Sequence, residues 1–354
     1  MKKVLLPKLF FRILNKAFRK QKYKDTILQK YLQYVTNVVG MKIFFADEVA
    51  ALSKEFPDKV LIQGASVYFK NVYLFKNGII QISENVYYVR DFYWYYVFLY
   101  DLKNYSKTTG RAKRIEVATM LCGSYSSSFN IFHFFIDSII ANFSFSVKAG
   151  ELFIVNDVKN EFQREVLSRL DVESFVEISN GPFFCETLKL GCFAGKWNRT
   201  QIQLFRDRVN PYVCESEKIL YITRSLDKRG FINEREVCHF LASRGVEVVD
   251  FSVMSLDERC ELLSRAKILI GQYGAGMSNM IFMPPGSYIL EIQLGSWVKE
   301  DYCTLANLCE HKYLFLPLPV KLFSNEKKFL FTSDDFYKLG QLLQIAKDSV
   351  DVGK

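Results

Sequence analysis

The chain has 354 residues, of which 49% are apolar and 24% charged, so it is long enough for two folded domains and too apolar to be disordered. Its net charge of +9 lies entirely within residues 1–30, which hold ten Lys or Arg against one acid, Asp25. A nucleic-acid-binding domain would carry such charge on its folded surface, so this distribution argues against nucleic acid as a partner.

Residues 1–24 combine basic and apolar side chains at helical spacing. The apolar residues that share one side are Leu5, Leu6, Leu9, Phe10, Ile13, Leu14 and Phe18. The apolar runs are too short to span a bilayer, and no signal-peptide core is present. This pattern predicts a peripheral helix on the anionic, cytoplasmic face of a membrane. A helix that packs on its own domain remains the alternative.

The eight cysteines have no CxxC pairing and no metal-ligand spacing. Without an export signal, they are expected to be reduced thiols of a cytoplasmic protein. No cluster of metal-ligating residues is recognisable, so we expect neither a metal nor another cofactor.

Two series of strands and helices follow the arm. Residues 41–105 are rich in Val, Ile, Tyr and Phe and predict short strands and hairpins, with a turn at 76–78. Beyond residue 115 the pattern alternates, with strands at 114–121, 151–157 and 174–179, a serine-capped helix at 124–143 and a helix at 160–170. Such alternation predicts a parallel α/β domain.

A second series begins after a predicted linker at 208–217. Its strands are expected at 218–223, 246–251, 267–271, 288–292 and 313–318. Asn233 with Glu236, and Ser255 with Glu258, predict two capping boxes. This half predicts a doubly wound sheet. The predicted divisions are a basic arm (1–30), an N-terminal α/β domain with a β-rich start (31–210), a Rossmann-like domain (211–320) and a helical end (321–354).

The stretch GQYGAGMSNM, residues 271–280, lies at the carboxyl end of a predicted strand. Gly271, Gly274 and Gly276 predict tight or left-handed turns and close approach of the backbone to a ligand. A helix start near Met277 would offer N–H groups to an anion, which favours a phosphate or diphosphate. Taken alone, the pattern is better explained by a glycine loop that only turns a corner.

Two charged residues lie near the same predicted sheet edge. Arg224 follows strand 218–223 directly, and a guanidinium can bind phosphate oxygens with two parallel hydrogen bonds. Glu291 lies in the strand after the glycine loop, where a carboxylate could accept hydrogen bonds from ribose hydroxyls. A salt bridge at the sheet edge is the alternative role for Glu291.

A polar stripe marks the otherwise apolar helix at 124–143. Asn130, His133 and Asp137 are spaced i, i+3 and i+7, so one face of a buried helix would carry all three. Buried polar groups require partners or a cleft. Both a catalytic role and a structural His–Asp pair fit this spacing.

Three separated motifs together resemble the catalytic domain of glycosyltransferase family 61. They are NIFHFFIDS (130–138), YITRSLDKRGFINEREV (221–237) and SLDERCELLSRAKILIGQYGAGMSNMIFMPPGSYILEI (255–292). The resemblance covers residues 115–320. It implies a GT-B architecture, in which two Rossmann-like domains face a cleft and the C-terminal one binds a sugar nucleotide.

The resemblance also implies roles for individual residues. Arg224 with the loop Gly274, Ala275 and Gly276 would hold the diphosphate, and Asn279 would support the loop or contact the donor. His133 and Asp137 would face the reacting sugar. The family usually has histidine where this chain has Tyr273, which carries no positive charge near neutral pH.

The prediction from these features is an inverting hexosyl- or pentosyltransferase. It would move a sugar from a nucleotide-sugar donor to a hydroxyl of a glycan or lipid-linked glycan, in surface or capsular polysaccharide synthesis. Asp137 is the expected base, with His133 orienting it or taking that role, and Asn130 in support. Two alternatives remain: a non-catalytic sugar-nucleotide-binding subunit of a polysaccharide machine, and a different Rossmann enzyme such as an epimerase.

Overall fold

The computed structural model describes residues 41–44, 54–55, 57–63, 66–75, 79–82, 85–89, 111–121, 125–140, 150–190, 199–224, 230–294, 299–318 and 329–351. The basic arm at 1–30 lies outside these ranges. The chain divides into two compact units, the first comprising Met1–Ala118 and Ile178–Lys189 and the second Thr119–Glu177 and Leu190–Lys354. Within the described residues, none of the helices has the length and apolar character needed to cross a membrane.

The first unit is built from short, mostly antiparallel strands. They are β1 (Met41–Phe44), β2 (Val60–Gln63), β3 (Ser66–Leu74), β4 (Ile79–Ile82), β5 (Asn85–Val89) and β9 (Phe183–Leu190). Strands β2 to β5 pair antiparallel in succession, which confirms the predicted hairpins. Strand β1 is parallel to β5, and β9 lies beside β3.

The second unit begins within β6 (Lys113–Leu121), whose end pairs in parallel with β7 (Phe153–Val155). Strand β7 in turn pairs in parallel with β8 (Phe175–Glu177). The helices of this part are η5 (Tyr125–Ser128), α5 (Ile131–His133), η6 (Phe134–Ile140), α6 (Glu161–Arg169) and, after β9, α7 (Arg199–Val209). The predicted alternation of strand and helix is therefore confirmed.

A five-stranded parallel sheet follows in the second unit, with the strand order β11-β10-β12-β13-β14. Its strands are β10 (Lys218–Ile222), β11 (Glu247–Val249), β12 (Ala266–Gln272), β13 (Tyr288–Leu294) and β14 (Lys312–Leu318). Its helices are α8 (Glu234–Ala242), η8 (Phe251–Val253), α9 (Leu256–Ser264), η9 (Ala275–Phe282), α10 (Asp301–Leu308) and α11 (Ser333–Asp351). This order has its switch point between β10 and β12, where such sheets bind ligands.

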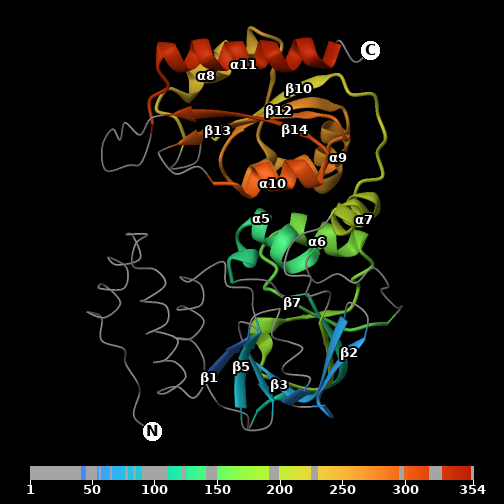
Figure 1. Cartoon of the computed structure of the whole chain (residues 1–354). Helices are drawn as coiled ribbons and strands as arrows, with labels where there is room; N and C mark the ends of the chain where they lie inside the picture. The colour runs from blue at the N-terminus through green and yellow to red at the C-terminus, as the bar shows by residue number, and fades with distance from the viewer. Residues whose placement is uncertain are drawn as a thin grey trace, which may run out of the picture. The chain divides into compact units, whose positions relative to one another are not determined.

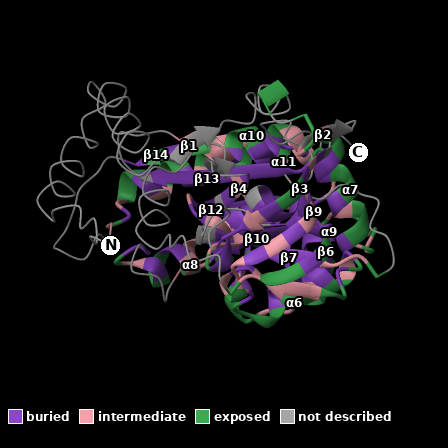
Figure 2. Cartoon of the chain, turned by 90° about the horizontal axis from the view of Figure 1, so that it is seen from below, coloured by how far each residue is buried: buried purple, intermediate pink, exposed green. Residues whose placement is uncertain are grey.

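Both faces of the five-stranded sheet are covered, so its strands read as continuous apolar runs. Helices α8 and α11 cover one face, and α9, η9 and α10 cover the other (Figure 1). Along β10 the side chains alternate between the two cores, since Tyr221 faces α8 and Leu220 faces α9. Figure 2 shows the burial of β12 and β13 in purple.

The predicted α/β class, with parallel strands dominating the second unit, is confirmed. The Ser255–Glu258 capping box is present, with both reciprocal bonds formed. The prediction of a capping box at Asn233 is wrong, because its side chain makes no capping hydrogen bond to the first turn of α8. The Asn233 side chain instead donates to Phe331 O at 2.9 Å and accepts from Phe331 N at 2.9 Å, so it ties α8 to the segment before α11. The GT-B arrangement and the domain boundaries at 30, 210 and 320 stay predictions.

Candidate functional site

The first motif follows β6 and does not form the single serine-capped helix that its pattern predicted. A 3₁₀ turn, η5, ends at Ser128, and a new helix begins at Ile131 and changes to a π-helix at Phe134. Asn130 is the N-cap, because its side chain accepts from Phe132 N at 2.9 Å and His133 N at 3.4 Å. The predicted stripe therefore starts with a capping residue, which satisfies backbone donors at the helix start.

The two proposed catalytic residues lie on this helix. His133 is buried, and its ring meets the ring of Phe132 edge-on, with centroids 5.4 Å apart. The backbone of Asp137 lies in the π-helix, and its side chain lies outside the described part of the structure. Their predicted pairing stays a prediction.

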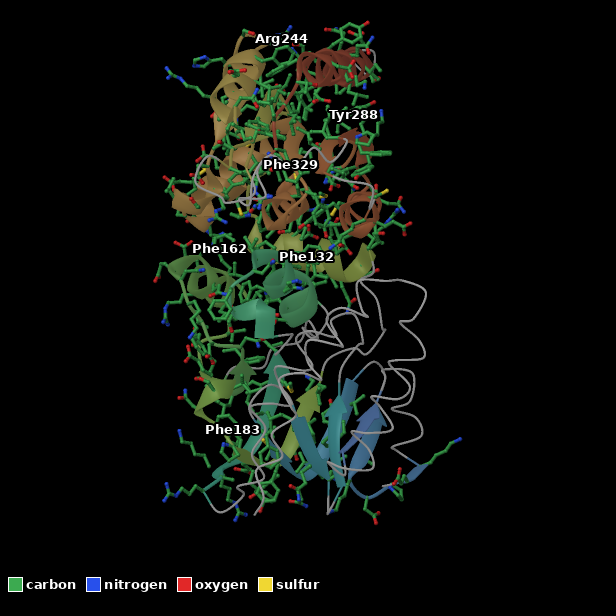
Figure 3. The ribbon with its side chains drawn as sticks, turned by 90° about the vertical axis from the view of Figure 1, so that its left-hand side faces the viewer. Phe132, Phe162, Phe183, Arg244, Tyr288 and Phe329 are labelled. Carbon is green, nitrogen blue, oxygen red and sulfur yellow. The ribbon has the colours of Figure 1, made fainter. Side chains whose placement is uncertain are left out.

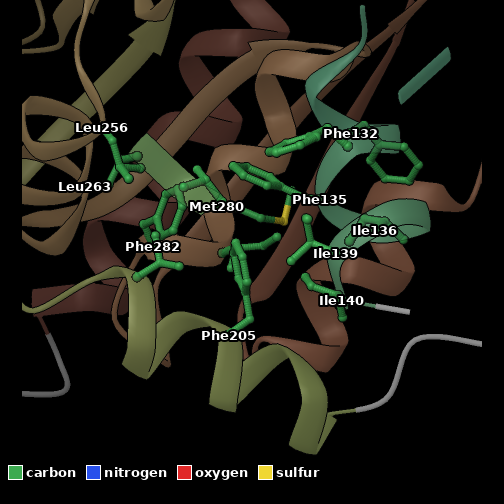
Figure 4. Packing of buried hydrophobic residues seen from close by; sticks show 14 of the residues in the cluster. Phe132, Phe135, Ile136, Ile139, Ile140, Phe205, Leu256, Leu263, Met280 and Phe282 are labelled. Carbon is green, nitrogen blue, oxygen red and sulfur yellow. The ribbon is translucent and has the colours of Figure 1, made fainter. Parts of the chain in front are cut away.

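The apolar side of the same helix packs on η9, the helix of the glycine loop (Figure 4). The ring of Phe135 lies edge-on to that of Phe282, with centroids 5.6 Å apart, and 5.3 Å from the ring of Phe205 on α7. On the preceding turn, Phe132 meets Tyr302 of α10 at 5.3 Å. The hydrophobic core thus brings the first motif and the glycine loop together within one unit.

The glycines of the loop serve close packing. The predicted tight or left-handed turns do not include a left-handed one, because none of Gly271, Gly274 and Gly276 lies in the left-handed region and Gly274, at φ 165°, is extended. A Cβ at Gly271 would lie 2.7 Å from the sulfur of Met277. A Cβ at Gly274 would lie 2.6 Å from a guanidinium nitrogen of Arg224. At Gly276 the closest atom would be a methyl carbon of Ile222 at 3.4 Å, an ordinary contact.

Arg224 holds the loop in place. Its Nη1 donates to the carbonyl of Tyr273 at 3.0 Å, and its guanidinium packs on Gly274. Its backbone N–H donates to the buried carboxylate of Glu234 at 3.1 Å, which also accepts from the Tyr221 hydroxyl at 2.8 Å. Glu234 therefore fixes the strand end that carries Arg224. Sequence reasoning missed this role, because a glutamate in the first turn of a helix is ordinary.

Both the hydroxyl and the ring of Tyr273 contact other side chains of the protein. Its hydroxyl donates to Asp301 Oδ2 at 2.7 Å, and its ring lies 5.1 Å from the ring of Tyr302. The Lys299 ammonium lies 5.1 Å from the centre of the Tyr273 ring. The hydroxyl predicted to reach a phosphate thus has a protein acceptor.

Glu291 lies deeper than predicted. It is 0% exposed, pairs with Gly271 in the sheet register, and accepts from the Tyr313 hydroxyl at 2.5 Å through Oε2. Its Oε1 has no hydrogen-bond partner among the described residues. Burial raises the pKa of this carboxyl to about 7. The sheet-edge position expected for it is wrong.

A pocket of about 590 Å³ lies beside the glycine loop, entirely within the second unit. The starts of four helices, α5, α6, α9 and η9, contribute to its wall. Its lining residues are Phe129, Asn130, Ile131, Phe134, Asn160, Glu161, Phe162, Gln163, Glu165, Phe251, Ser252, Val253, Met254, Ser255, Arg259, Ala275, Gly276 and Asn279. First-turn N–H groups and the helix dipole favour anions. Those of Phe132, His133, Gln163, Leu256 and Glu258 already donate to protein oxygens. The donors open to a negatively charged ligand are therefore mainly those at the starts of η9 and α6.

The pocket unites some of the predicted site residues and leaves out others. Asn130, Ala275, Gly276 and Asn279 line it. His133, Arg224, Tyr273, Gly274 and Glu291 do not belong to its lining. Asn279 is buried, and its side chain donates to the carbonyl of Gly276 at 2.7 Å, a bond within the loop.

The comparison with protein families decides what kind of domain this is. Residues 131–290 match the model of the family described as Glycosyltransferase 61, from α5 through the glycine loop into β13. The chain carries a glycosyltransferase 61 domain. A search of curated proteins found no match. The match confirms the resemblance read from the three motifs and makes the domain that of a transferase.

Within the glycosyltransferase 61 domain, one pocket residue had no sequence signal. Arg259 of α9 is 6% exposed, and its Nε donates to Met254 O at 3.1 Å. Its guanidinium lies 3.9 Å from the centre of the ring of Phe162, which Figure 3 labels on α6. Burial lowers the pKa of Arg259 to about 10. An arginine on a helix with many charges is ordinarily solvent-facing, which is why sequence reasoning passed over it.

The described part of the domain contains no group of three His, Cys, Asp or Glu side chains that could hold a metal ion. The pocket lining combines N–H donors, Arg259 and the side chains of Asn130 and Asn279 with the carboxylates of Glu161 and Glu165. Glu161 lies 4.0 Å from the Arg164 guanidinium, and Glu165 accepts from Leu256 N at 2.7 Å. The N–H groups and Arg259 can bind and stabilise negative charge.

Proposed function

We propose that the chain is an inverting glycosyltransferase, which moves a hexosyl or pentosyl group from a nucleotide-sugar donor to a hydroxyl of a glycan or lipid-linked glycan. The observation that carries the proposal is the pocket at the glycine loop, built from four helix starts inside the family-matched segment. A nucleoside diphosphate has the negative charge that such a wall favours. Surface or capsular polysaccharide synthesis is the proposed setting.

In the proposed reaction, the acceptor hydroxyl oxygen attacks the anomeric carbon from the face opposite the leaving group. The bond from that carbon to the phosphate oxygen breaks, and the nucleoside diphosphate leaves with the bonding electron pair. The hydroxyl proton passes to Asp137, with His133 orienting that carboxylate or accepting the proton itself. The N–H groups of Ala275 and Gly276 stabilise the charge on the leaving diphosphate.

Arg224 and Tyr273 lie on the side of the glycine loop away from the pocket lining, where we propose that they hold the loop in position. Arg224 fixes the carbonyl of Tyr273 and so the direction in which the first N–H groups of η9 point. We propose that its positive charge also stabilises the diphosphate. Glu291 is fully buried and accepts from the Tyr313 hydroxyl, so we propose that it stabilises the sheet beneath the loop and makes no bond to a ribose hydroxyl.

The proposal is tested by incubating the full chain with a panel of nucleotide sugars and measuring release of nucleoside diphosphate, with and without glycan acceptors. Release that depends on an acceptor supports transfer. Asp137→Asn should lower turnover by about 10² to 10⁴-fold while donor binding is kept. If His133→Ala loses turnover and Asp137→Asn does not, His133 is the base. Full activity of both variants would remove the motif from the mechanism.

A non-catalytic sugar-nucleotide-binding subunit is the second candidate. It is favoured by Tyr273, which stands where the family usually has histidine and whose hydroxyl is bonded to Asp301. Saturable binding of a nucleotide sugar without turnover, across the whole panel of donors and acceptors, would support this candidate over the transferase.

We further propose that residues 1–30 bind the cytoplasmic face of a membrane. The support is their charge, since each Lys or Arg near an anionic surface contributes about 1 kcal/mol. Deleting residues 1–24 should release the protein from anionic liposomes in co-sedimentation while its unfolding transition is kept. Equal co-sedimentation of the deleted and full chains would contradict the proposal.

A further inference from the structure

Arg259 is held rigidly at the pocket wall. Its Nε donates a hydrogen bond to the carbonyl of Met254, and its guanidinium carbon lies 3.9 Å from the centre of the Phe162 ring. The ring of Phe251 lies on the same guanidinium at 6.0 Å. A guanidinium fixed in this way presents its two terminal nitrogens in one orientation, so little entropy is lost when they bind a ligand.

Within the described residues, the terminal nitrogens of Arg259 have no protein acceptor and the side chain forms no ion pair. Glu165, which also lines the pocket, and Asp250 act on the charge of Arg259 without forming an ion pair with it, and both accept hydrogen bonds from other groups. Glu165 accepts from Leu256 N at 2.7 Å, and Asp250 accepts from the backbone N–H of Ser252 at 2.9 Å and from its hydroxyl at 2.6 Å. Buried charges in proteins are ordinarily paired, because desolvation of an unpaired charge is costly. An arginine that is 6% exposed and lines a pocket therefore calls for an anionic ligand.

The remaining wall of the pocket adds N–H donors to Arg259, beside the carboxylates of Glu161 and Glu165. Ala275 and Gly276 are the first residues of η9, so their N–H groups have no acceptor within that helix. The α6 start adds the N–H groups of Glu161 and Phe162, since the cap Asn160 bonds to Gln163 N. These donors and one arginine match the several oxygens of a diphosphate better than a single carboxylate.

Two of the exposed residues that line the pocket are apolar. Phe129 is 63% exposed and Val253 is 80% exposed, and both line the pocket. Exposed apolar side chains beside a site for anions suit a ligand that joins a charged group to a ring or chain. A diphosphate ester has that composition, whereas free phosphate does not.

We propose that Arg259 binds one phosphate of a diphosphate ester in this pocket, while the N–H groups of Ala275 and Gly276 bind the other. The assignment of that ester to the donor rests on the proposed function. The same chemistry is found in a nucleoside diphosphate and in a lipid diphosphate that carries an acceptor, so both sources enter the test.

The experiment is calorimetric titration of the full chain with inorganic pyrophosphate, with four nucleoside diphosphates (UDP, GDP, CDP and dTDP), and with geranyl diphosphate. Arg259→Gln is expected to weaken binding of pyrophosphate and of the preferred ester by about 10 to 100-fold, the range for a charge-assisted hydrogen bond. Arg259→Lys should recover only part of the loss, since the planar fork is absent. The matched control is Arg164→Gln, an exposed arginine of α6 outside the pocket lining.

Binding of a nucleoside diphosphate and not of geranyl diphosphate assigns the pocket to the donor, and the reverse assigns it to a lipid acceptor. Wild-type affinity in a folded Arg259→Gln protein would overturn the proposal, as would an equal loss in Arg164→Gln or binding of neither ester. If Arg259→Gln does not fold, Arg259→Lys decides, and unchanged affinity in it overturns the proposal. Loss of affinity in these variants without any sugar transfer leaves this inference standing and contradicts the proposed function.

Discussion

The two sides of the glycine loop differ in what their arginines do. Arg224, on the sheet side, donates a hydrogen bond to the carbonyl of Tyr273 and packs on Gly274. Arg259, on the pocket side, is more deeply buried, yet its terminal nitrogens have no acceptor in the described structure. The side of the loop that carries Arg224 and Tyr273, here called the tied side, is therefore held by hydrogen bonds within the protein. The side that carries Arg259, here called the pocket side, presents donors to a ligand. The position of an arginine at a strand end does not by itself reveal which role it has.

The largest expected effect concerns Glu291, beneath the tied side. The pKa of this carboxyl is about 7 in the folded chain against 4.5 as the ordinary value. Between these pH values unfolding releases a proton, so the folded state loses stability as pH rises from about 4.5 to 7 and loses no more above that. The loss amounts to about 3 kcal/mol.

Replacing Glu291 by Gln removes this titration and leaves an amide oxygen that can accept from Tyr313. Urea unfolding of Glu291→Gln should therefore show a flatter dependence on pH between 5 and 7 than the wild type. The same slope in both proteins would show that Glu291 does not carry a raised pKa.

Arg224 is the next test of the comparison. Arg224→Ala should weaken nucleoside diphosphate binding by about 1.5 to 3 kcal/mol, and Arg224→Lys should recover only part. Because Arg224 also ties the loop, the ligand-free Ala variant should unfold at lower urea concentration. Arg259→Gln should lose binding with a smaller loss of ligand-free stability. Equal stability losses for the two arginines, measured by urea unfolding, would remove the distinction between the two sides.

The packing of the loop provides a third test. In Gly271→Ala the new methyl group would lie 2.7 Å from the sulfur of the buried Met277, so the core must shift. Overpacking of this kind costs about 1 to 3 kcal/mol. Gly276→Ala is the matched control, since its methyl group would meet Ile222 at 3.4 Å. Urea unfolding should separate the two variants, and equal midpoints would contradict close packing at Gly271.

The sequence predicted the strands of the second unit well because both faces of that sheet are buried. Buried parallel strands carry continuous apolar runs, as in 267–271 and 288–292, and such runs are visible locally. Strand β9 was missed because it pairs with strands far away in the chain, and nothing near residues 183–190 signals such pairing. Local sequence patterns therefore reveal strands that are covered by helices on both faces. They miss a strand whose pairing partners are far away in the sequence.

The candidate site shows the same limit at the level of single residues. Asn130 and Gly274 were recognised as residue types, but their roles as helix cap and as a platform for Arg224 depend on contacts. Arg259 became visible only when α9 was placed against Phe162 of α6, about a hundred residues earlier in the chain. Unpaired charge is a property of the folded environment, and no spacing rule expresses it.

The smallest expected effect concerns Tyr273, at the edge of the tied side. Tyr273→Phe removes the hydrogen bond to Asp301 and keeps the ring against Tyr302, so folding stability should fall by about 1 kcal/mol in urea unfolding. Tyr273→His restores the residue usual in the family, should preserve folding, and should leave turnover unchanged or raise it. Because the Tyr273 hydroxyl donates to Asp301 and the residue lies outside the pocket lining, neither change should alter pyrophosphate affinity by more than a few-fold. A tenfold loss of that affinity in Tyr273→Phe would place the tyrosine hydroxyl on the ligand.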